Sequence, residues 1–201
     1  MATRTDVIND ALNLLDQSDS TGPNDTSSWV RKVSNRYEGV ARRLLSDHPW
    51  NFAEERVKLE RLDETPIGWT YSYNKPGDCL RICKISDTGL KSDNPFKEYD
   101  DSKGRIMTNL STVYLFYISD SWVTLEGSWP SLFAYAISAE IAFLVNGPTT
   151  KSRTKGLDLR SEAKNAFRKA KTWDAQQKPS DELPHGRWVR SMSARRTAEN
   201  G

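Results

Sequence analysis

The stretch that decides the fold is His48-Pro49-Trp50-Asn51-Phe52, because the spacing of apolar residues changes there. Between Val30 and Leu44 apolar side chains recur at steps of three and four, as on one face of a helix. After the stretch the period is two, as in Trp69-Thr70-Tyr71-Ser72-Tyr73, which is typical of a half-buried strand. Pro49 disfavours helical geometry in the residue before it, so the helix should end at about Asp47. The stretch therefore predicts a junction between a helical layer and a β layer.

Four helices are predicted on either side of the β-patterned region. Capping residues stand at or near the start of three of them: Thr5 or Asp6, then Asp25, Thr26 or Ser27, and finally Asp158. Pro130 suits the first turn of another helix, which Asn146-Gly147-Pro148 is expected to stop, and Pro179 should end the last one. The expected helices cover about residues 5–16, 25–47, 129–145 and 158–178.

The region from Ala53 to Leu125 has the pattern of strands and turns. Asp100-Asp101-Ser102-Lys103-Gly104 is a good hairpin turn between two of the strands. The segment 112–119 is apolar on both faces, which indicates a central strand covered on both sides. The expected strands are 57–59, 69–73, 79–85, 96–99, 105–107 and 112–119.

These elements predict an α+β fold: an antiparallel bundle of four main helices, with a β-rich insertion between the second and third helices and an extended C-terminal tail. The predicted bundle is 1–52 with 127–178, the insertion is 53–126, and the tail is 179–201. Pro49, Trp50 and Phe52 are predicted to form a structural hinge, in which the two aromatic side chains attach the insertion to the bundle.

Composition restricts the class of protein loosely. The 201 residues include seven Trp, seven Tyr and six Phe, which is core material that a disordered chain lacks. A net charge of +2 is too small to imply a general affinity for nucleic acid or membranes. No apolar run approaches the roughly 20 residues that span a bilayer, and the N-terminus has no apolar signal core. We therefore expect a soluble protein made in the cytoplasm.

Candidate chemistry is sparse in this sequence. Cys79 and Cys83, on one face of a strand, would lie about 13 Å apart, too far for a disulfide, and His48 and His185 are the sole histidines. His48 is expected to cap helix carbonyls rather than to act in catalysis. No nucleotide-binding or hydrolase motif is found. We expect no catalytic residue, no metal and no cofactor, and hence not an enzyme.

Three basic segments remain. The outer face of the second helix is either a solvated surface or a subunit contact, and the loop at 149–156 carries three cations that could face a subunit or DNA. The C-terminal run could be a disordered end, a segment that orders on a partner, or a nucleic-acid contact. The residues are, in turn, Arg31, Lys32, Arg36, Arg42 and Arg43; Lys151, Arg153 and Lys155; and Arg187, Trp188, Arg190, Arg195 and Arg196.

The order of several short motifs resembles that of a known family. The motifs are Arg42-x-Leu44-Leu45 with His48-Pro49-Trp50-Asn51-Phe52-Ala53, Tyr71-x-Tyr73, Pro76-x-Asp78-Cys79-Leu80-Arg81, Val113-Tyr114-Leu115-Phe116-Tyr117, an Ala-rich helix, and Ala170-x-x-Trp173-Asp174-Ala175. Over residues 5–177 this arrangement is similar to the head-to-tail adaptors of short-tailed bacteriophages, the tail tubular protein A type. Lys75 departs from the pattern, in which an apolar residue precedes the proline.

The resemblance implies a structural virion protein of the tail or neck, assembled in the host cytoplasm. It implies a ring of about twelve copies between the portal protein and the tail nozzle protein. DNA would pass through the lumen without sequence-specific binding, and no membrane, catalytic residue or cofactor is implied. By the same resemblance the portal-docking residues are Arg187, Trp188, Arg190, Arg195 and Arg196. The alternative is a small nucleic-acid-binding protein that uses this tail and the 151–155 loop.

Overall fold

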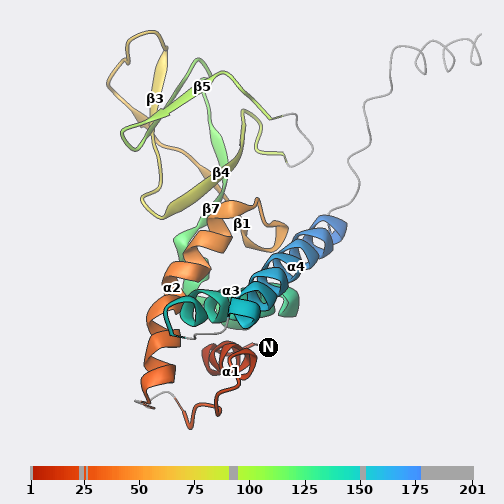
Figure 1. Ribbon diagram of the computed structural model, residues 1–201. Helices are drawn as coiled ribbons and strands as arrows, with labels where there is room; N and C mark the ends of the chain where they lie inside the picture. Colours follow the sequence, from red (N-terminus) through yellow and green to blue (C-terminus); the bar gives the residue numbers. More distant parts are fainter. Residues whose placement is uncertain (1, 23–24, 26, 91–94, 150–152, 178–201) are drawn as a thin grey trace, which may run out of the picture.

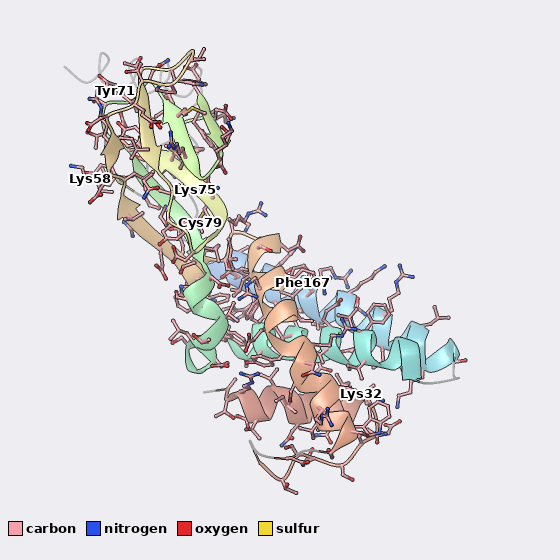
Figure 2. The ribbon with its side chains drawn as sticks, turned by 90° about the vertical axis from the view of Figure 1, so that its left-hand side faces the viewer. Lys32, Lys58, Tyr71, Lys75, Cys79 and Phe167 are labelled. Carbon is pink, nitrogen blue, oxygen red and sulfur yellow. The ribbon has the colours of Figure 1, made fainter. Side chains whose placement is uncertain are left out.

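The computed structural model describes residues 2–22, 25, 27–90, 95–149 and 153–177. The fold is α+β, as predicted: a helical layer and a β-rich layer are stacked end to end, so the molecule is elongated (Figure 1). Figure 2 shows the same arrangement from the side, with Tyr71 at the far end of the β layer and Lys32 toward the opposite end of the helical layer. The C-terminal tail from 178 onward lies outside the described residues.

The helical layer is built on α3, Ser131–Thr149, which packs against the other three helices of the described chain. These are α1, Arg4–Leu14, α2, Ser28–Asp47, and α4, Arg153–Gln177. The hydroxyl of Tyr135 near the start of α3 binds Glu162, whereas Asn146 near its end lies beside Gly156. These contacts run in opposite order along the two helices, so α3 and α4 are antiparallel.

The N-terminal caps account for where the first two helices begin. Thr3 and Asp6 form a reciprocal capping box at α1, so the cap lies two residues before Thr5 and three before Asp6, which is the N3 partner. The Ser27 hydroxyl accepts from the Val30 amide and caps α2. The predicted end of α2 at Asp47 is confirmed.

Two predicted boundaries in the C-terminal half are wrong. Asn146-Gly147-Pro148 does not stop α3, which continues to Thr149. The last helix begins at Arg153, five residues before the predicted cap Asp158, so Arg153 and Lys155 belong to α4 and not to a loop. Gly156 lies within the first turn of this helix, beside the side chain of Asn146 of α3.

The β layer contains two antiparallel sheets in the described residues. One has the order β1-β7-β4, formed by Glu54–Lys58, Tyr114–Ser119 and Cys79–Ser86. The other has the order β2-β3-β6-β5, formed by Arg61–Leu62, Tyr71–Asn74, Arg105–Thr108 and Tyr99–Ser102. Lys103 and Gly104 both have positive φ and close the β5-β6 hairpin, a tighter turn than the predicted 100–104.

Strand β7 is central and buried on both faces, as its sequence predicted. Leu115 and Tyr117 belong to a cluster enclosed between the two sheets, whereas Ile118 belongs to the core of the helical layer. The single strand therefore contributes side chains to both hydrophobic cores of the molecule. The sheet cluster consists of Leu59, Tyr73, Ile85, Ile106, Val113, Leu115 and Tyr117.

The two cysteines do not share a face of β4, contrary to the prediction. Register shifts between Cys79 and Arg81 and between Ile82 and Lys84 interrupt the alternation of side chains. Cys79 consequently packs against the sheet cluster and Cys83 against the helical core. Both cysteines are partly buried, and neither forms a disulfide among the described residues.

The departure at Lys75 has a local explanation. Its ammonium contacts both carboxylate oxygens of Asp101 on β5, at 2.7 and 2.9 Å, and its amide donates to the Gly104 carbonyl. An ion pair to the neighbouring hairpin thus stands where the related pattern has an apolar contact.

Candidate functional site

The junction between the layers is an aromatic cluster centred on Trp50. Its side chain is 1% exposed and its ring lies 4.8 Å from Phe133 of α3 and 5.8 Å from Phe167 of α4, measured between centroids. Phe52 contacts Trp50, Phe133 and Trp122, with centroids 5.6, 5.1 and 5.7 Å apart. The two side chains predicted to attach the insertion thus touch rings from both C-terminal helices.

Trp50 also caps the end of α2. Its indole Nε1 donates to the Leu44 carbonyl at 2.8 Å, one of the carbonyls that has no partner within the helix. This role was predicted for His48, which makes no such bond to any described residue. His48 has the extended backbone that a residue before proline requires, so its ring turns away from the helix end toward Trp50 and α4.

Asp174 on α4 fixes the backbone of the junction. Its carboxylate is 1% exposed and accepts from the amide of Asn51 at 2.9 and 3.1 Å and from the amide of Phe52 at 3.4 Å. The Asn51 side chain donates to the same carboxylate and to the Asp174 carbonyl, each at 3.0 Å. Because a buried carboxylate is costly unless it is hydrogen-bonded, these donors are what allows Asp174 to be buried.

His48 completes this polar group. Its Nε2 lies 3.8 Å from the Asp174 carboxylate, and its side chain is 25% exposed. Burial lowers the pKa of His48 below its ordinary value of 6.5, and the charges of Lys171 and Arg81 act in the same direction. The Asp174 carboxylate raises the pKa of this imidazole but does not outweigh the burial. His48 is therefore favoured in its neutral form in the folded protein.

The chain returns to the helical layer next to α2, where three polar contacts hold it. Arg42 binds Asp120 through two hydrogen bonds of 2.7 and 3.1 Å, and the Tyr37 hydroxyl donates to Glu126 at 3.0 Å. From β4, Arg81 donates to the carbonyl of Ser46 at 2.9 Å. Both ends of the insertion are thus attached to the end of the bundle, one through α4 and the other through α2.

The basic residues predicted to face a subunit or DNA are only partly described. Lys151 lies outside the described residues, and Arg153 begins α4. Lys155 forms an ion pair with Asp16, which follows α1, so its charge is partly neutralised within the chain. On α2, Arg42 and Arg43 pair with Asp120 and Glu140, whereas Arg31, Lys32 and Arg36 are exposed.

A different basic surface lies on α4. Arg160, Lys164 and Arg168 are exposed and recur every four residues, and like charges at that spacing disfavour an isolated helix by about 0.2–0.5 kcal/mol a pair. Lys169 is exposed beside them. Within the part of the chain that the structure describes, none of these four residues forms an ion pair.

Next to this surface is an open hollow of about 360 Å³ near the C-terminal end of α4. It is lined by Leu132, Arg168, Lys169, Thr172, Trp173 and Gln176. Trp173 follows Phe167 and Ala170 at helical spacing, yet among the described residues its ring is not part of the core of the helical layer. The spacing alone did not distinguish this side chain from Phe167, which does pack on the core.

Asp174 is the functional residue that sequence reasoning missed. It lies four residues after Ala170 and seven after Phe167, on the apolar face of the helix, and an acid at such a position signals a buried polar contact. Its partners are 123 residues away along the chain, so the sequence alone could not identify them.

The structure does not describe the residues that were predicted to dock on the portal. Arg187, Trp188, Arg190, Arg195 and Arg196 lie outside the described residues. In the described ranges no group of three or more His, Cys, Asp or Glu side chains is placed to hold a metal ion. No helix among them is long and apolar enough to cross a membrane.

Comparison with known proteins adds no assignment: the chain matches no protein-family model and no curated protein sequence.

Replacing Trp50 tests the importance of the aromatic cluster. We expect Trp50→Ala to lower the free energy of unfolding by about 3–5 kcal/mol, because it leaves a cavity and removes the cap of α2. Hydrogen exchange should show lost protection in β1 and β7. Trp69→Ala is the matched control, since Trp69 belongs to neither core cluster, and it should change stability little. Native protection of the strands in the Trp50 variant would contradict the expected role.

The environment of His48 predicts a dependence of stability on pH. The pKa of His48 is lower in the folded state than in the unfolded chain. As the pH falls below about 6.5, the unfolded chain therefore binds the proton first, and the free energy of unfolding decreases. Urea unfolding at about pH 7.5 and about pH 5.5 should show a smaller difference for His48→Gln than for the unchanged protein. His185→Gln, which alters the other histidine, should keep the full difference. If the His48 variant kept the full difference in stability between the two pH values, His48 would not be the group responsible.

Proposed function

We propose that the protein is a head-to-tail adaptor of a short-tailed bacteriophage, of the tail tubular protein A type. In this role it forms a ring, of about twelve copies by the family resemblance, that joins the portal protein to the tail nozzle protein. The duplex leaves the capsid through the lumen of this ring. The protein works by holding partners together and not by catalysing a reaction.

One observation carries this proposal: the order of the motifs along residues 5–177 together with the fold they adopt. The resemblance implies a helical bundle interrupted by a β-rich insertion, and the chain has that architecture. The motif residues are also structurally important here. Trp50 and Phe52 occupy the aromatic cluster, and Asp174, from the motif at the end of the last helix, binds Asn51.

The attachment of the insertion suits a protein that must hold two partners at a fixed distance from each other. The β layer is held to the bundle at both of its ends, by Asp174 of α4 and by Arg42 of α2. A partner that binds the bundle end of this elongated molecule is therefore kept at a fixed distance from one that binds the strands (Figure 1). The small net charge of +2 also suits a protein that lines a DNA channel, because tight binding to phosphates would stall the moving duplex.

The alternative, a small nucleic-acid-binding protein, has one observation in its favour. The exposed α4 residues Arg160, Lys164 and Arg168 form a row of unpaired cations among the described residues, and such a row attracts phosphate. The two functions differ in a measurable way: binding through these cations weakens steeply as salt rises, whereas assembly on a portal gives a particle of defined size and symmetry.

Electron microscopy of the chain mixed with the portal protein of the same phage tests the adaptor proposal. We expect rings stacked on the portal, and we expect deletion of residues 180–201 to abolish them, because the tail carries the docking residues. A chain that ends at Arg196 is the matched control and should still dock. Unchanged portal binding by the longer deletion would exclude the tail as the docking element. If the full-length chain did not bind the portal but bound short duplex DNA in a salt-dependent way, the result would favour a nucleic-acid-binding protein.

A further inference from the structure

The hollow at the C-terminal end of α4 has two features of a binding site for a short peptide. The ring of Trp173 and the side chain of Leu132 give it an apolar wall, and Trp173 is partly buried although its ring lies outside the helical core. Arg168 and Lys169 give it a basic edge. A ligand that fills it should thus present an apolar side chain next to negative charge.

The basic edge is available for such a ligand. Both cations are exposed, and in the described part of the chain neither forms an ion pair. Within the described ranges the Arg168 guanidinium donates one hydrogen bond, to the neutral side-chain oxygen of Asn165 at 3.2 Å. Lys171, on the adjoining face, differs from them because it lies 3.7 Å from the carboxylate of Asp47 and over the ring of Phe167. Among the described residues, the two positive charges at the hollow therefore have no negative partner.

The chain itself supplies a segment with the complementary chemistry. The described part of α4 ends at Gln177, one residue after Gln176, which lines the hollow. The sequence then reads Lys178-Pro179-Ser180-Asp181-Glu182-Leu183-Pro184. Asp181 and Glu182 are the first acids after the helix, and Leu183 follows them directly. An acid pair with an adjacent leucine matches a basic edge with an adjacent tryptophan.

The distances allow this segment to reach the hollow of its own chain. Lys169 lies eight residues before Gln177, which is about 12 Å along a helix. Asp181 and Leu183 lie four and six residues after Gln177, and these residues can span roughly 13 and 20 Å when extended. Pro179 cannot continue a helix, so a change of direction beyond α4 is expected there.

We propose that Asp181-Glu182-Leu183 binds in this hollow of the same chain. The two carboxylates pair with Arg168 and Lys169, and the Leu183 side chain packs on Trp173 and Leu132. The interaction fixes the base of the tail against α4, so that the basic run from Arg187 to Arg196 starts from a defined place on the bundle. It does not depend on the identity of the partner that this run meets, and it stands whether or not the adaptor proposal is correct.

Cysteine cross-linking in the full-length chain tests the proposal. In a chain with Cys79→Ala and Cys83→Ala, we expect Thr172→Cys and Leu183→Cys to form a disulfide within one chain on mild oxidation. Ala175→Cys with Leu183→Cys is the matched control, because Ala175 is exposed on α4 and close to the start of the tail but does not line the hollow, and this pair should cross-link at least about tenfold more slowly. Equal rates for the two pairs would overturn the proposal.

Charge reversal tests which residues hold the segment. Asp181→Lys with Glu182→Lys should slow the cross-link by about threefold or more, the size expected for exposed ion pairs, and Arg168→Glu with Lys169→Glu should restore the rate in the same chain. No effect of the first pair, or no rescue by the second, would overturn the charge pairing. Cross-links that join two chains instead of closing within one would show that a second copy fills the hollow, and would overturn the intramolecular assignment.

Hydrogen exchange provides a measurement that leaves the native cysteines in place. Amides of the last two turns of α4 should exchange faster in the Asp181→Lys, Glu182→Lys variant than in the unchanged protein, while α3 keeps its protection. Identical exchange of α4 in both proteins would contradict binding of the segment. Because these substitutions lie beyond the helix, a failure of the bundle to fold does not confuse the result.

Discussion

The fold depends on one buried carboxylate. Asp174 lies on the last helix, yet its hydrogen bonds go to the amides of Asn51 and Phe52, where the chain leaves the second helix for the β layer. A buried donor or acceptor left without a partner costs about 1–3 kcal/mol, and here a single acid satisfies several donors at once. The C-terminal helix therefore stabilises the turn by which the N-terminal half of the molecule leaves the bundle.

The aromatic cluster around this contact gives the junction its packing energy, whereas the hydrogen bonds give it direction. Trp50 packs between the two C-terminal helices and also satisfies a carbonyl at the end of α2, so one side chain ends a helix and anchors the strand that follows. On the returning side Arg42 and Tyr37 bind the 3-10 turns after β7. Strand β7 joins the two cores, because Leu115 and Tyr117 belong to the sheet cluster and Ile118 to the helical core. These ties explain how a β layer with a core of its own is fixed to the helices.

Much of this architecture could be predicted, because its signals are local. The change of period at Pro49, the turn at Lys103-Gly104 and the two apolar faces of β7 each lie within a few residues. The wrong predictions concern features that depend on contacts between residues far apart in the sequence. Helix α4 begins at Arg153, although Gly156 and the basic residues before it predicted a loop, and it packs there against α3. The faces of Cys79 and Cys83 depend on two bulges that a count of alternating residues cannot reveal. Asp174 could be recognised as an acid on an apolar face, but not matched to Asn51.

The most direct test of the central claim is a double-mutant cycle between Asn51 and Asp174. The free energy of unfolding is measured for Asn51→Ala, for Asp174→Ala and for the two together. If the contact attaches the β layer to the last helix, the single changes overlap, and the coupling energy should exceed about 1 kcal/mol, within the range found for residues in contact. Costs that simply add, to within about 0.5 kcal/mol, would show that the two residues act independently and would contradict the account.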